Sequence, residues 1–300
     1  MFDFILQGEL LYVGCNQIGA GPAGISAALY TIRSGLETTV ITAGDSALAK
    51  AEKFENYYGF AEPISGKELL THGIDGAERL GVKFTNKQAV SIDYEDGGFS
   101  VVTSDDKKHR CKAVLLATGS RRLAPSIEGL TEFEGKGVSY CAVCDAFFSQ
   151  KQNVGVLGSG EYALHEAKSS RKNHQKALPC SQTAKSRRQY FPQNLQLLKN
   201  RCRLSRVTQK SKKPFLRDGT EVKIDGIFVA YGVASSAALA QKAGAVTIGG
   251  KIRVNDSMMT NVNGLFAAGD CTGGLLQVSK AVGDGAAAGM AIIKYVKREK

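Results

Sequence analysis

A glycine-rich turn followed by an amphipathic helix constrains the fold of this chain more than any other feature of its sequence. In the segment IGAGPAGISAALYTIRSG, Gly19, Gly21 and Gly24 have the spacing G-x-G-x-x-G, and the apolar residues that follow recur at helical intervals. Such glycines let the backbone approach a pyrophosphate, whose charge then faces the N-terminus of the helix. The segment before the turn is a poor candidate for a central parallel strand, because Asn16 and Gln17 are polar.

The same order of strand, glycine turn and helix returns about 140 residues later. There the apolar segment NVGVLG leads into Gly158, Gly160 and Ala163, which keep the spacing of a phosphate-binding loop. Further short apolar segments that run into glycine lie at 113–119, 224–232 and 263–270. We therefore predict an α/β fold with two Rossmann-like domains of the kind that bind FAD or NAD(P). The alternative for each turn is a tight turn that binds no ligand.

Cys141 and Cys144 form a C-x-x-C pair, and Asp145 follows directly. The pair could bind zinc, but the other five cysteines and the four histidines supply neither a second pair nor an H-x3-5-H spacing. We favour a redox dithiol, because C-x-x-C geometry lowers the pKa of one thiol and the thiolate is the nucleophile in disulfide exchange. An inert buried pair is the remaining alternative. Asp145 is a candidate proton donor or acceptor, with a helix-capping role as its alternative.

Composition narrows the class of protein. The 300 residues, of which 43% are hydrophobic and 22% charged, are typical of about two soluble globular domains. No apolar run approaches the roughly 18 residues of a membrane span, and the N-terminal segment lacks the features of a signal peptide. Seven cysteines are an odd number, which argues against a disulfide-stapled secreted fold. We therefore expect a cytoplasmic protein with no bound metal and no membrane partner.

One segment accounts for the net charge of +11. Residues 167–217 contain 15 Lys or Arg and no acidic residue, which leaves 24 basic against 28 acidic residues elsewhere. We do not expect nucleic-acid binding, because the aromatic residues of this segment, Tyr190, Phe191 and Phe215, are not interleaved with the charges along it. The segment could instead be a basic surface that docks an acidic partner. We favour a third interpretation, a reading-frame error in the gene, because Glu codons read out of frame become Lys and Arg codons; resequencing would test it.

Six segments, spread in order over most of the chain, resemble the low-molecular-weight thioredoxin reductases, which are homodimeric flavoproteins. They are IGAGPAGISAALYTIRSGLETTVI, ENYYGF, ISGKELL, LLATGSRR, FEGKGVSYCAVCDAFF and GLFAAGDCTGGLLQVSKAVGDGAAAG. The resemblance implies a discontinuous FAD domain, residues 1–117 and 246–300. A second Rossmann-like domain, residues 118–245, would be inserted into it and carry the redox cysteines. The implied substrate is the disulfide of thioredoxin, and the implied assembly is a homodimer.

The resemblance also implies roles for individual residues. Cys144 would face the flavin, Cys141 would exchange with the substrate thiol, and Asp145 would serve as acid and base. Asp270 would contact the ribityl and pyrophosphate region of FAD, and Gln277 would lie near the isoalloxazine ring. The other residues implied to bind FAD are Gly19, Gly21, Ala23, Gly24, Asn56, Thr118, Gly119 and Gly269.

The source of electrons departs from the commonest pattern of these enzymes. Most take hydride from NADPH and carry an H-R-R-x-x-x-R run, whose arginines pair with the 2′-phosphate. This chain lacks that run, and its adjacent Arg187 and Arg188 stand in a different context. The segments YCAVCDAFF, GEYALHEA and GIFVAYGVASS instead resemble the ferredoxin-linked flavin thioredoxin reductases, which implies ferredoxin as the donor and argues against NADPH. The open alternatives are an NADPH-dependent enzyme, a flavin dithiol oxidase and an inactive basic binding module.

Overall fold

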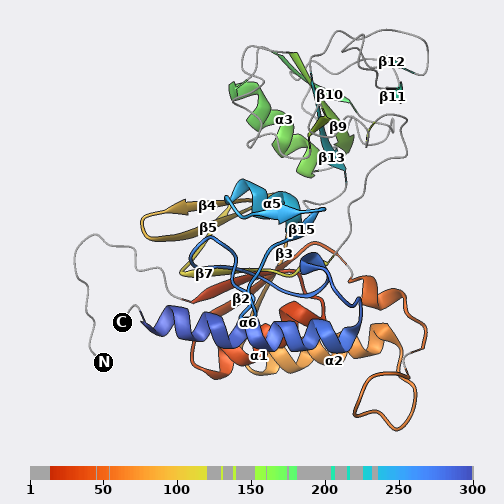
Figure 1. The fold of residues 1–300 in the computed structure, drawn as a ribbon, viewed down its shortest axis with the longest axis vertical. Coiled ribbons are helices and arrows are strands. Elements are labelled where there is room, and N and C mark those ends of the chain that lie inside the picture. The colour runs from red at the N-terminus through yellow and green to blue at the C-terminus, as the bar shows by residue number, and fades with distance from the viewer. Residues whose placement is uncertain are drawn as a thin grey trace.

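The computed structural model of the chain consists of two bodies of helices and strands (Figure 1). The first body comprises residues 14–119 and 236–298, and the second comprises residues 138–231, as far as each is described. The residues that the structure describes are 14–44, 46–53, 55–119, 130, 138–139, 153–159, 161–173, 176–180, 204–206, 215–216, 226–231 and 236–298.

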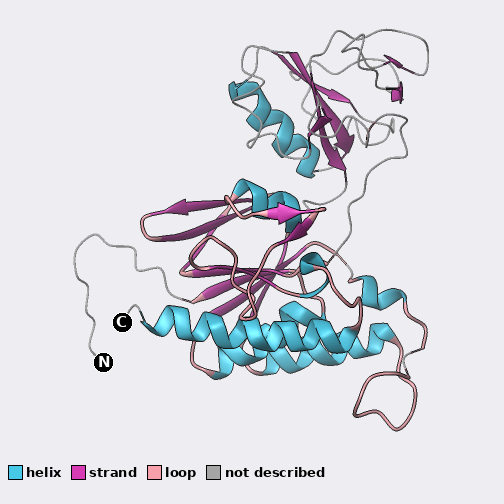
Figure 2. Cartoon of the chain, viewed as in Figure 1, coloured by secondary structure: helices cyan, strands magenta, loops and turns pink. Residues whose placement is uncertain are grey.

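A five-stranded parallel sheet with the order β16-β7-β1-β2-β3 forms the centre of the first body. Its strands are β1 (Cys15–Ile18), β2 (Thr38–Thr42), β3 (Lys83–Asn86), β7 (Ala113–Leu116) and β16 (Leu265–Ala267). One layer of helices covers one face of this sheet (Figure 2). These helices are α1 (Pro22–Arg33), α2 (Gly66–Arg79) and α6 (Val278–Arg298). An antiparallel sheet lies on the other side and is made of β4 (Ala89–Glu95), β5 (Gly98–Thr103) and β6 (Lys108–Cys111).

The second body contains a parallel sheet with the order β10-β9-β13-β8, and helix α3 packs on it. Its elements are β8 (Val138–Ser139), β9 (Asn153–Ser159), α3 (Glu161–Asn173), β10 (Lys176–Cys180) and β13 (Gly226–Tyr231). The remaining described elements are η1 (Ala47–Lys50), β11 (Leu204–Arg206), β12 (Phe215–Leu216), α5 (Ser236–Lys242), β14 (Thr247–Ile248), β15 (Lys251–Ile252) and η2 (Gly269–Thr272). Two parallel sheets, each with a strand–turn–helix unit, confirm the predicted α/β fold class. No helix among the described residues is long and apolar enough to cross a membrane.

The expectation that the segment before Gly19 would make a poor central strand is wrong. Residues 15–18 form β1, which pairs with β2 on one side and β7 on the other. Asn16 and Gln17 are 4% and 0% exposed. The amide of Asn16 donates to the carbonyl of His109 at 2.9 Å, and that of Gln17 donates to the hydroxyl of Thr31 at 3.2 Å. These hydrogen bonds offset part of the cost of burying the amides, although the amide oxygen of Gln17 accepts no hydrogen bond from the described residues. The pattern of apolar residues in the sequence does not reveal these partners.

Helix α6 crosses α1 at close range through small residues. A Cβ on Gly285 would lie 2.2 Å from the carbonyl oxygen of Ala23, so only glycine permits this approach. The hydroxyl of Ser26 donates to the carbonyl of Val282 at 2.8 Å within the same contact. The crossing therefore holds the beginning of α6 beside the beginning of α1, although the two helices are about 250 residues apart in the sequence.

Helix α5 packs against β4, β7, β14 and β15, which are elements of the first body. The predicted domain division, in which the inserted domain spans residues 118–245, places this helix in the inserted domain. That division stays a prediction; from the contacts of α5 we propose that the chain returns to the first body before residue 236.

A buried ion pair joins the two bodies. Lys242 of α5 pairs with Glu166 of α3 and donates to the carbonyl of Val90 in β4 at 3.2 Å. Its ammonium group also lies 5.3 Å from the ring centroid of Tyr162 in α3. Burial opposes ionisation of Glu166, but the hydrogen bond with His165 and the charge of Lys242 outweigh it and lower the pKa of this carboxyl.

Candidate functional site

Three neighbouring strands of the first sheet end at one edge, and each runs into glycine. Gly19 follows β1, Gly119 follows β7 after two residues, and Gly269 follows β16 after one. The strand ends are held in register, for example by the bond from the Ala117 amide to the Ile18 carbonyl at 2.8 Å. Ligands of open parallel sheets bind beyond the carboxyl ends of the strands, so this edge is the candidate site.

The three glycines of the first turn are needed for different physical reasons. Gly19 has φ +113°, a left-handed conformation, and a Cβ on Gly24 would lie 2.0 Å from the carbonyl oxygen of Gly19. These two glycines are therefore required by the fold of the turn itself. Gly21 has φ −77°, and among the described residues a Cβ there would meet only the hydroxyl of Ser46, at 3.4 Å. Packing against this part of the chain does not explain Gly21, whereas a ligand that approaches the backbone would.

The first turn of α1 is suited to an anion. Gly21 occupies the N-cap position, makes no side-chain cap bond, and is followed by no acidic residue in the first turn. Ala23 lies buried in that turn. The N–H groups at the beginning of a helix lack partners within it and carry the positive end of the helix dipole. This N-terminus fits the pyrophosphate of a dinucleotide.

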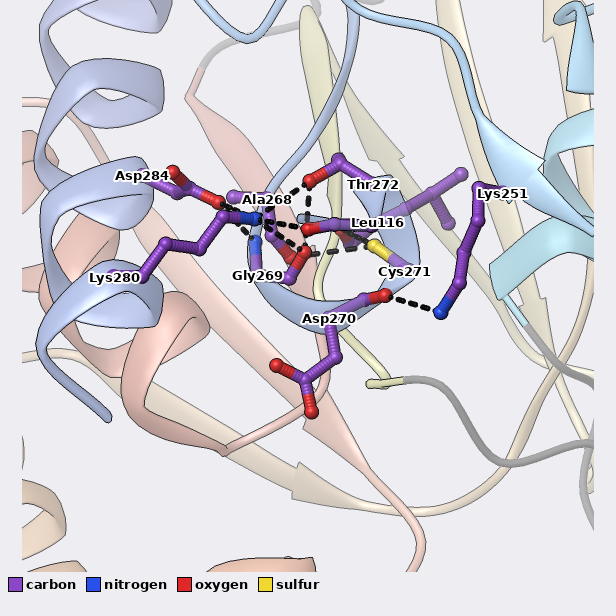
Figure 3. Close-up of polar contacts among 10 residues, drawn as sticks. Leu116, Lys251, Ala268, Gly269, Asp270, Cys271, Thr272, Lys280 and Asp284 are labelled. Carbon is purple, nitrogen blue, oxygen red and sulfur yellow. Dashed lines mark hydrogen bonds and ion pairs between the residues drawn. The ribbon is translucent and has the colours of Figure 1, made fainter. Parts of the chain in front are cut away.

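The turn after β16, residues 269–273, supplies the second half of the site (Figure 3). Asp270 lies in η2, and the described residues give its carboxylate no hydrogen bond or ion pair, since only its backbone carbonyl is engaged. In Figure 3 this carboxylate points away from the side chains that hold the turn. A carboxylate that has no partner among the described residues, just beyond the carboxyl end of β16, fits the hydroxyl groups of a flavin dinucleotide.

Two lysines hold the backbone of this turn. The ammonium group of Lys280 donates to the carbonyls of Gly269 at 3.2 Å and Gly273 at 2.7 Å, and to the hydroxyl of Thr272 at 3.1 Å. Lys280 also pairs with Asp284 at 2.6 Å, and Asp284 accepts a bond from the Gly269 amide at 3.0 Å. From the opposite side, the ammonium group of Lys251 donates to the Asp270 carbonyl at 2.8 Å.

The structure brings together two predicted residues that are 221 positions apart. The amide of Asn56 donates to the amide oxygen of Gln277 at 3.1 Å. Thr118 contacts α5 of the same body instead: its backbone amide donates to the hydroxyl of Ser236 at 3.1 Å, and the two hydroxyl groups are hydrogen-bonded at 2.6 Å. Gly119 has φ +74°, and no atom of the described residues lies within 4 Å of a Cβ built there.

The cysteines of the first body are unsuited to redox exchange. Cys15, Cys111 and Cys271 are buried and free. Burial raises the pKa of Cys15 and Cys111, and raises that of Cys271 to about 11. The Cys271 thiol donates to the carbonyls of Leu116 at 3.4 Å and Ala268 at 3.2 Å, so it serves the packing of the strand ends. Thiols that stay protonated at neutral pH are poor nucleophiles.

The second glycine turn is explained largely by packing. A Cβ on Gly158 would lie 2.0 Å from the carbonyl oxygen of Ala230 in the neighbouring strand, and Ala163 is fully buried. Gly160 and the predicted catalytic residues, Cys141, Cys144 and Asp145, lie outside the described residues. Among the described residues, no group of three or more His, Cys, Asp or Glu side chains could hold a metal ion.

Sequence reasoning missed the residues that support the turn, namely Lys251, Lys280 and Asp284. A signal was present for two of them. Lys280 and Asp284 are four residues apart in VSKAVGDG, directly before a helical pattern of small residues, and i, i+4 charges share one face of a helix. The sequence gives no reason to expect that this pair turns back onto a loop rather than into solvent.

The sequence of residues 18–285 matches the pyridine nucleotide-disulphide oxidoreductase family. The thioredoxin reductase of Aquifex aeolicus (strain VF5) is 33% identical over 300 residues, which cover 94% of this chain and 93% of that protein. Among solved structures, the atypical thioredoxin reductase TRi from Desulfovibrio vulgaris Hildenborough is 35% identical, with a TM-score of 0.87 over 95% of this chain and 98% of that chain. A ferredoxin-flavin thioredoxin reductase from Clostridium acetobutylicum is 28% identical, with a TM-score of 0.70 over 96% of this chain and 99% of that chain.

A parallel sheet with an anion-binding turn at its carboxyl edge, and with an aspartate there that has no partner among the described residues, is typical of a dinucleotide-binding oxidoreductase fold. The chain belongs to the pyridine nucleotide-disulphide oxidoreductase family and, within it, to the thioredoxin reductases. The resemblance drawn from the six segments and the prediction of an enzyme are thereby confirmed. Membership of this family implies a flavin cofactor.

Proposed function

We propose that this chain reduces the disulfide of a thioredoxin by means of FAD and the dithiol Cys141/Cys144, with electrons from reduced ferredoxin. The observation that carries the proposal is the site at the strand ends. There the open N-terminus of α1 fits the pyrophosphate of FAD, and the carboxylate of Asp270, which has no partner among the described residues, fits a hydroxyl group of the same cofactor. The ferredoxin-flavin enzyme of Clostridium acetobutylicum, which is similar over almost the whole chain, supports the choice of donor.

FAD would be held by the turn at Gly19, Gly21 and Gly24, with its pyrophosphate at the beginning of α1 and a hydroxyl group bonded to Asp270. Asn56 and Gln277, which contact each other, would border the ring system. When bound, FAD supplies a centre that accepts electrons from a donor and passes them to a disulfide. The lack of an H-R-R-x-x-x-R run removes the usual partner of the NADPH 2′-phosphate.

The dithiol would perform the exchange with the substrate. The thiolate of Cys141 attacks the thioredoxin disulfide, forms a mixed disulfide and releases one thioredoxin thiolate, which takes up a proton. Cys144 then attacks the Cys141 sulfur, and the second thioredoxin thiolate leaves. Asp145 would carry the protons that the dithiol releases and the thioredoxin thiolates take up. One dithiol is oxidised for each disulfide that is reduced. The proposed assembly is a homodimer and the proposed compartment is the cytoplasm, where thioredoxin is maintained as a dithiol.

The donor is tested under anaerobic conditions by supplying the enzyme and oxidised thioredoxin with either reduced ferredoxin or NADPH. We expect turnover with ferredoxin and, at micromolar NADPH, a rate at least about 100-fold lower, since the sequence lacks the H-R-R-x-x-x-R run whose arginines pair with the 2′-phosphate. The Cys144→Ser variant is the control, because it should bind flavin but not reduce thioredoxin with either donor. Efficient turnover with NADPH would contradict the choice of donor. Oxygen-dependent dithiol oxidation would instead identify an oxidase, and a colourless protein an inactive binding module.

A further inference from the structure

We infer that Lys280 is a positioning residue for FAD: with Asp284 it fixes the turn 269–273, so that Asp270 faces the cofactor. The inference rests on the proposed function, since it assumes that FAD occupies the edge of the first sheet. It assigns a ligand-binding role to a lysine that itself points into the protein backbone rather than into the site.

The turn needs an external support. Gly269 and Gly273 have φ +80° and +88°, left-handed conformations that glycine adopts readily but does not enforce. Two carbonyls of the turn, those of Gly269 and Gly273, accept bonds from a single ammonium group, that of Lys280. One side chain therefore ties the first residue of the turn to the last.

The charge of Lys280 is balanced within the same cluster. Its side chain is 22% exposed and that of Asp284 is 12% exposed, and the two are paired at 2.6 Å. The carboxylate of Asp284 accepts a hydrogen bond from the amide of Gly269, and the ammonium group of Lys280 donates one to the carbonyl of the same residue. The pair thus binds both polar groups of the Gly269 backbone. Charge-assisted hydrogen bonds of this kind are about twice as strong as neutral ones, so the turn has little freedom while the pair is intact.

The pair also links the turn to the other half of the site. Lys280 and Asp284 lie near the beginning of α6, which is fixed against α1 by the contact of Gly285 with the Ala23 carbonyl. A Cβ on Gly269 would lie 3.0 Å from the Cβ of Ala23 in the first turn of α1. Support from α6 therefore sets Asp270 relative to the helix N-terminus that fits the pyrophosphate.

Asp270 is left as the one group of the turn that faces outward. Its carbonyl is held by Lys251, the carbonyls of Gly269 and Gly273 are held by Lys280, and its carboxylate points away from both lysines (Figure 3). A contact made by this carboxylate to FAD depends on the backbone conformation that the lysines enforce. Loss of Lys280 should therefore weaken FAD binding through Asp270 rather than through any direct contact.

The test is a comparison of FAD dissociation constants, measured from the quenching of flavin fluorescence when FAD is added to the full-length apoprotein. We expect Lys280→Met to raise the dissociation constant about tenfold or more, as happens when a supporting hydrogen-bond network is lost. Asp284→Asn should act in the same direction. Lys294→Met, on the exposed side of the same helix, is the matched control and should change the constant less than twofold.

A double variant separates positioning from general stabilisation. If Lys280 acts through Asp270, Lys280→Met should have little further effect on FAD affinity in an Asp270→Asn background. Equal effects of Lys280→Met in both backgrounds would overturn the inference, as would unchanged FAD affinity in the single variant, even if that variant is less stable to urea. A wild-type apoprotein that binds no FAD would overturn the proposed function as well, so the two failures are distinguishable.

Discussion

Replacement of Lys242 with methionine should destabilise the contact between the two bodies by about 3–5 kcal/mol, the usual cost of removing one partner of a buried ion pair. The side chains of Lys242 and Glu166 are only 3% and 2% exposed. Without the lysine, the Glu166 carboxylate stays buried with one fewer cation beside it, and the carbonyl of Val90 loses its side-chain donor. Methionine replaces much of the apolar volume, so the loss measures the charge and its hydrogen bonds rather than a cavity.

The measurement is the urea midpoint of the full chain, followed by circular dichroism, with the flavin state held constant. Lys168→Met is the matched control, because Lys168 lies on the same helix as Glu166 and faces Asp106 of the first body at 4.0 Å. That pair is exposed at 51% and 76%, and its loss should change the stability by less than about 1 kcal/mol. Equal effects of the two substitutions would show that burial does not strengthen the Lys242 pair.

The same comparison has a defined pH dependence. Because the pKa of Glu166 is lowered in the folded chain, the pair contributes its full stability above the ordinary Glu pKa of about 4.3 and loses it as pH falls through the folded value. Lys242→Met removes one of the groups that lower this pKa. The difference in stability between wild type and variant should therefore be largest near neutral pH and shrink below about pH 4.

The sequence was sufficient for the parts of the site that depend on local conformation. The spacing of Gly19, Gly21 and Gly24 predicted a glycine turn that leads into a helix, and the structure contains one. The spacing of glycines in the sequence indicates where the backbone of a turn is left-handed or closely approached by another segment. The prediction of the turn depended on these local requirements alone and was therefore correct. The spacing could not distinguish a glycine that packing requires from a glycine that a ligand requires. Gly158 has the spacing of a phosphate-binding loop, yet the carbonyl of Ala230 leaves no room for a Cβ there.

Contacts between distant segments account for most of what the sequence could not reveal. The polarity of Gln17 argues against a central strand when only the neighbouring residues are considered. Its hydrogen-bond partner, Thr31, lies on the following helix and is brought next to it only by the packing of that helix on the sheet. Glu166 and Lys242 are 76 residues apart, and neither carries a sign that it would be buried. Polar residues are buried where hydrogen-bond or charge partners from distant segments pack against them. A single sequence does not reveal which distant residues become such partners.

Substitution of alanine for Gly24 and for Gly21 should separate the fold of the first turn from its ligand. Gly24→Ala places a Cβ 2.0 Å from the Gly19 carbonyl oxygen and 3.1 Å from its carbon, so α1 must move. We expect a loss of about 1–3 kcal/mol or more in the stability of the apoprotein, measured by urea unfolding. FAD binding should be lost with it, because the helix N-terminus and the turn no longer meet at the strand ends.

Gly21→Ala should do the reverse. Its φ of −77° suits alanine, and the new Cβ would meet only the Ser46 hydroxyl at 3.4 Å, so the stability of the apoprotein should change by less than about 0.5 kcal/mol. FAD affinity should nevertheless fall about tenfold or more, because the methyl group stands where the backbone must approach the pyrophosphate. Gly76→Ala, in open space on α2, is the control that should leave FAD affinity unchanged. Wild-type FAD affinity in Gly21→Ala would mean that the pyrophosphate does not bind at this turn, and the site would have to be sought elsewhere along the sheet edge.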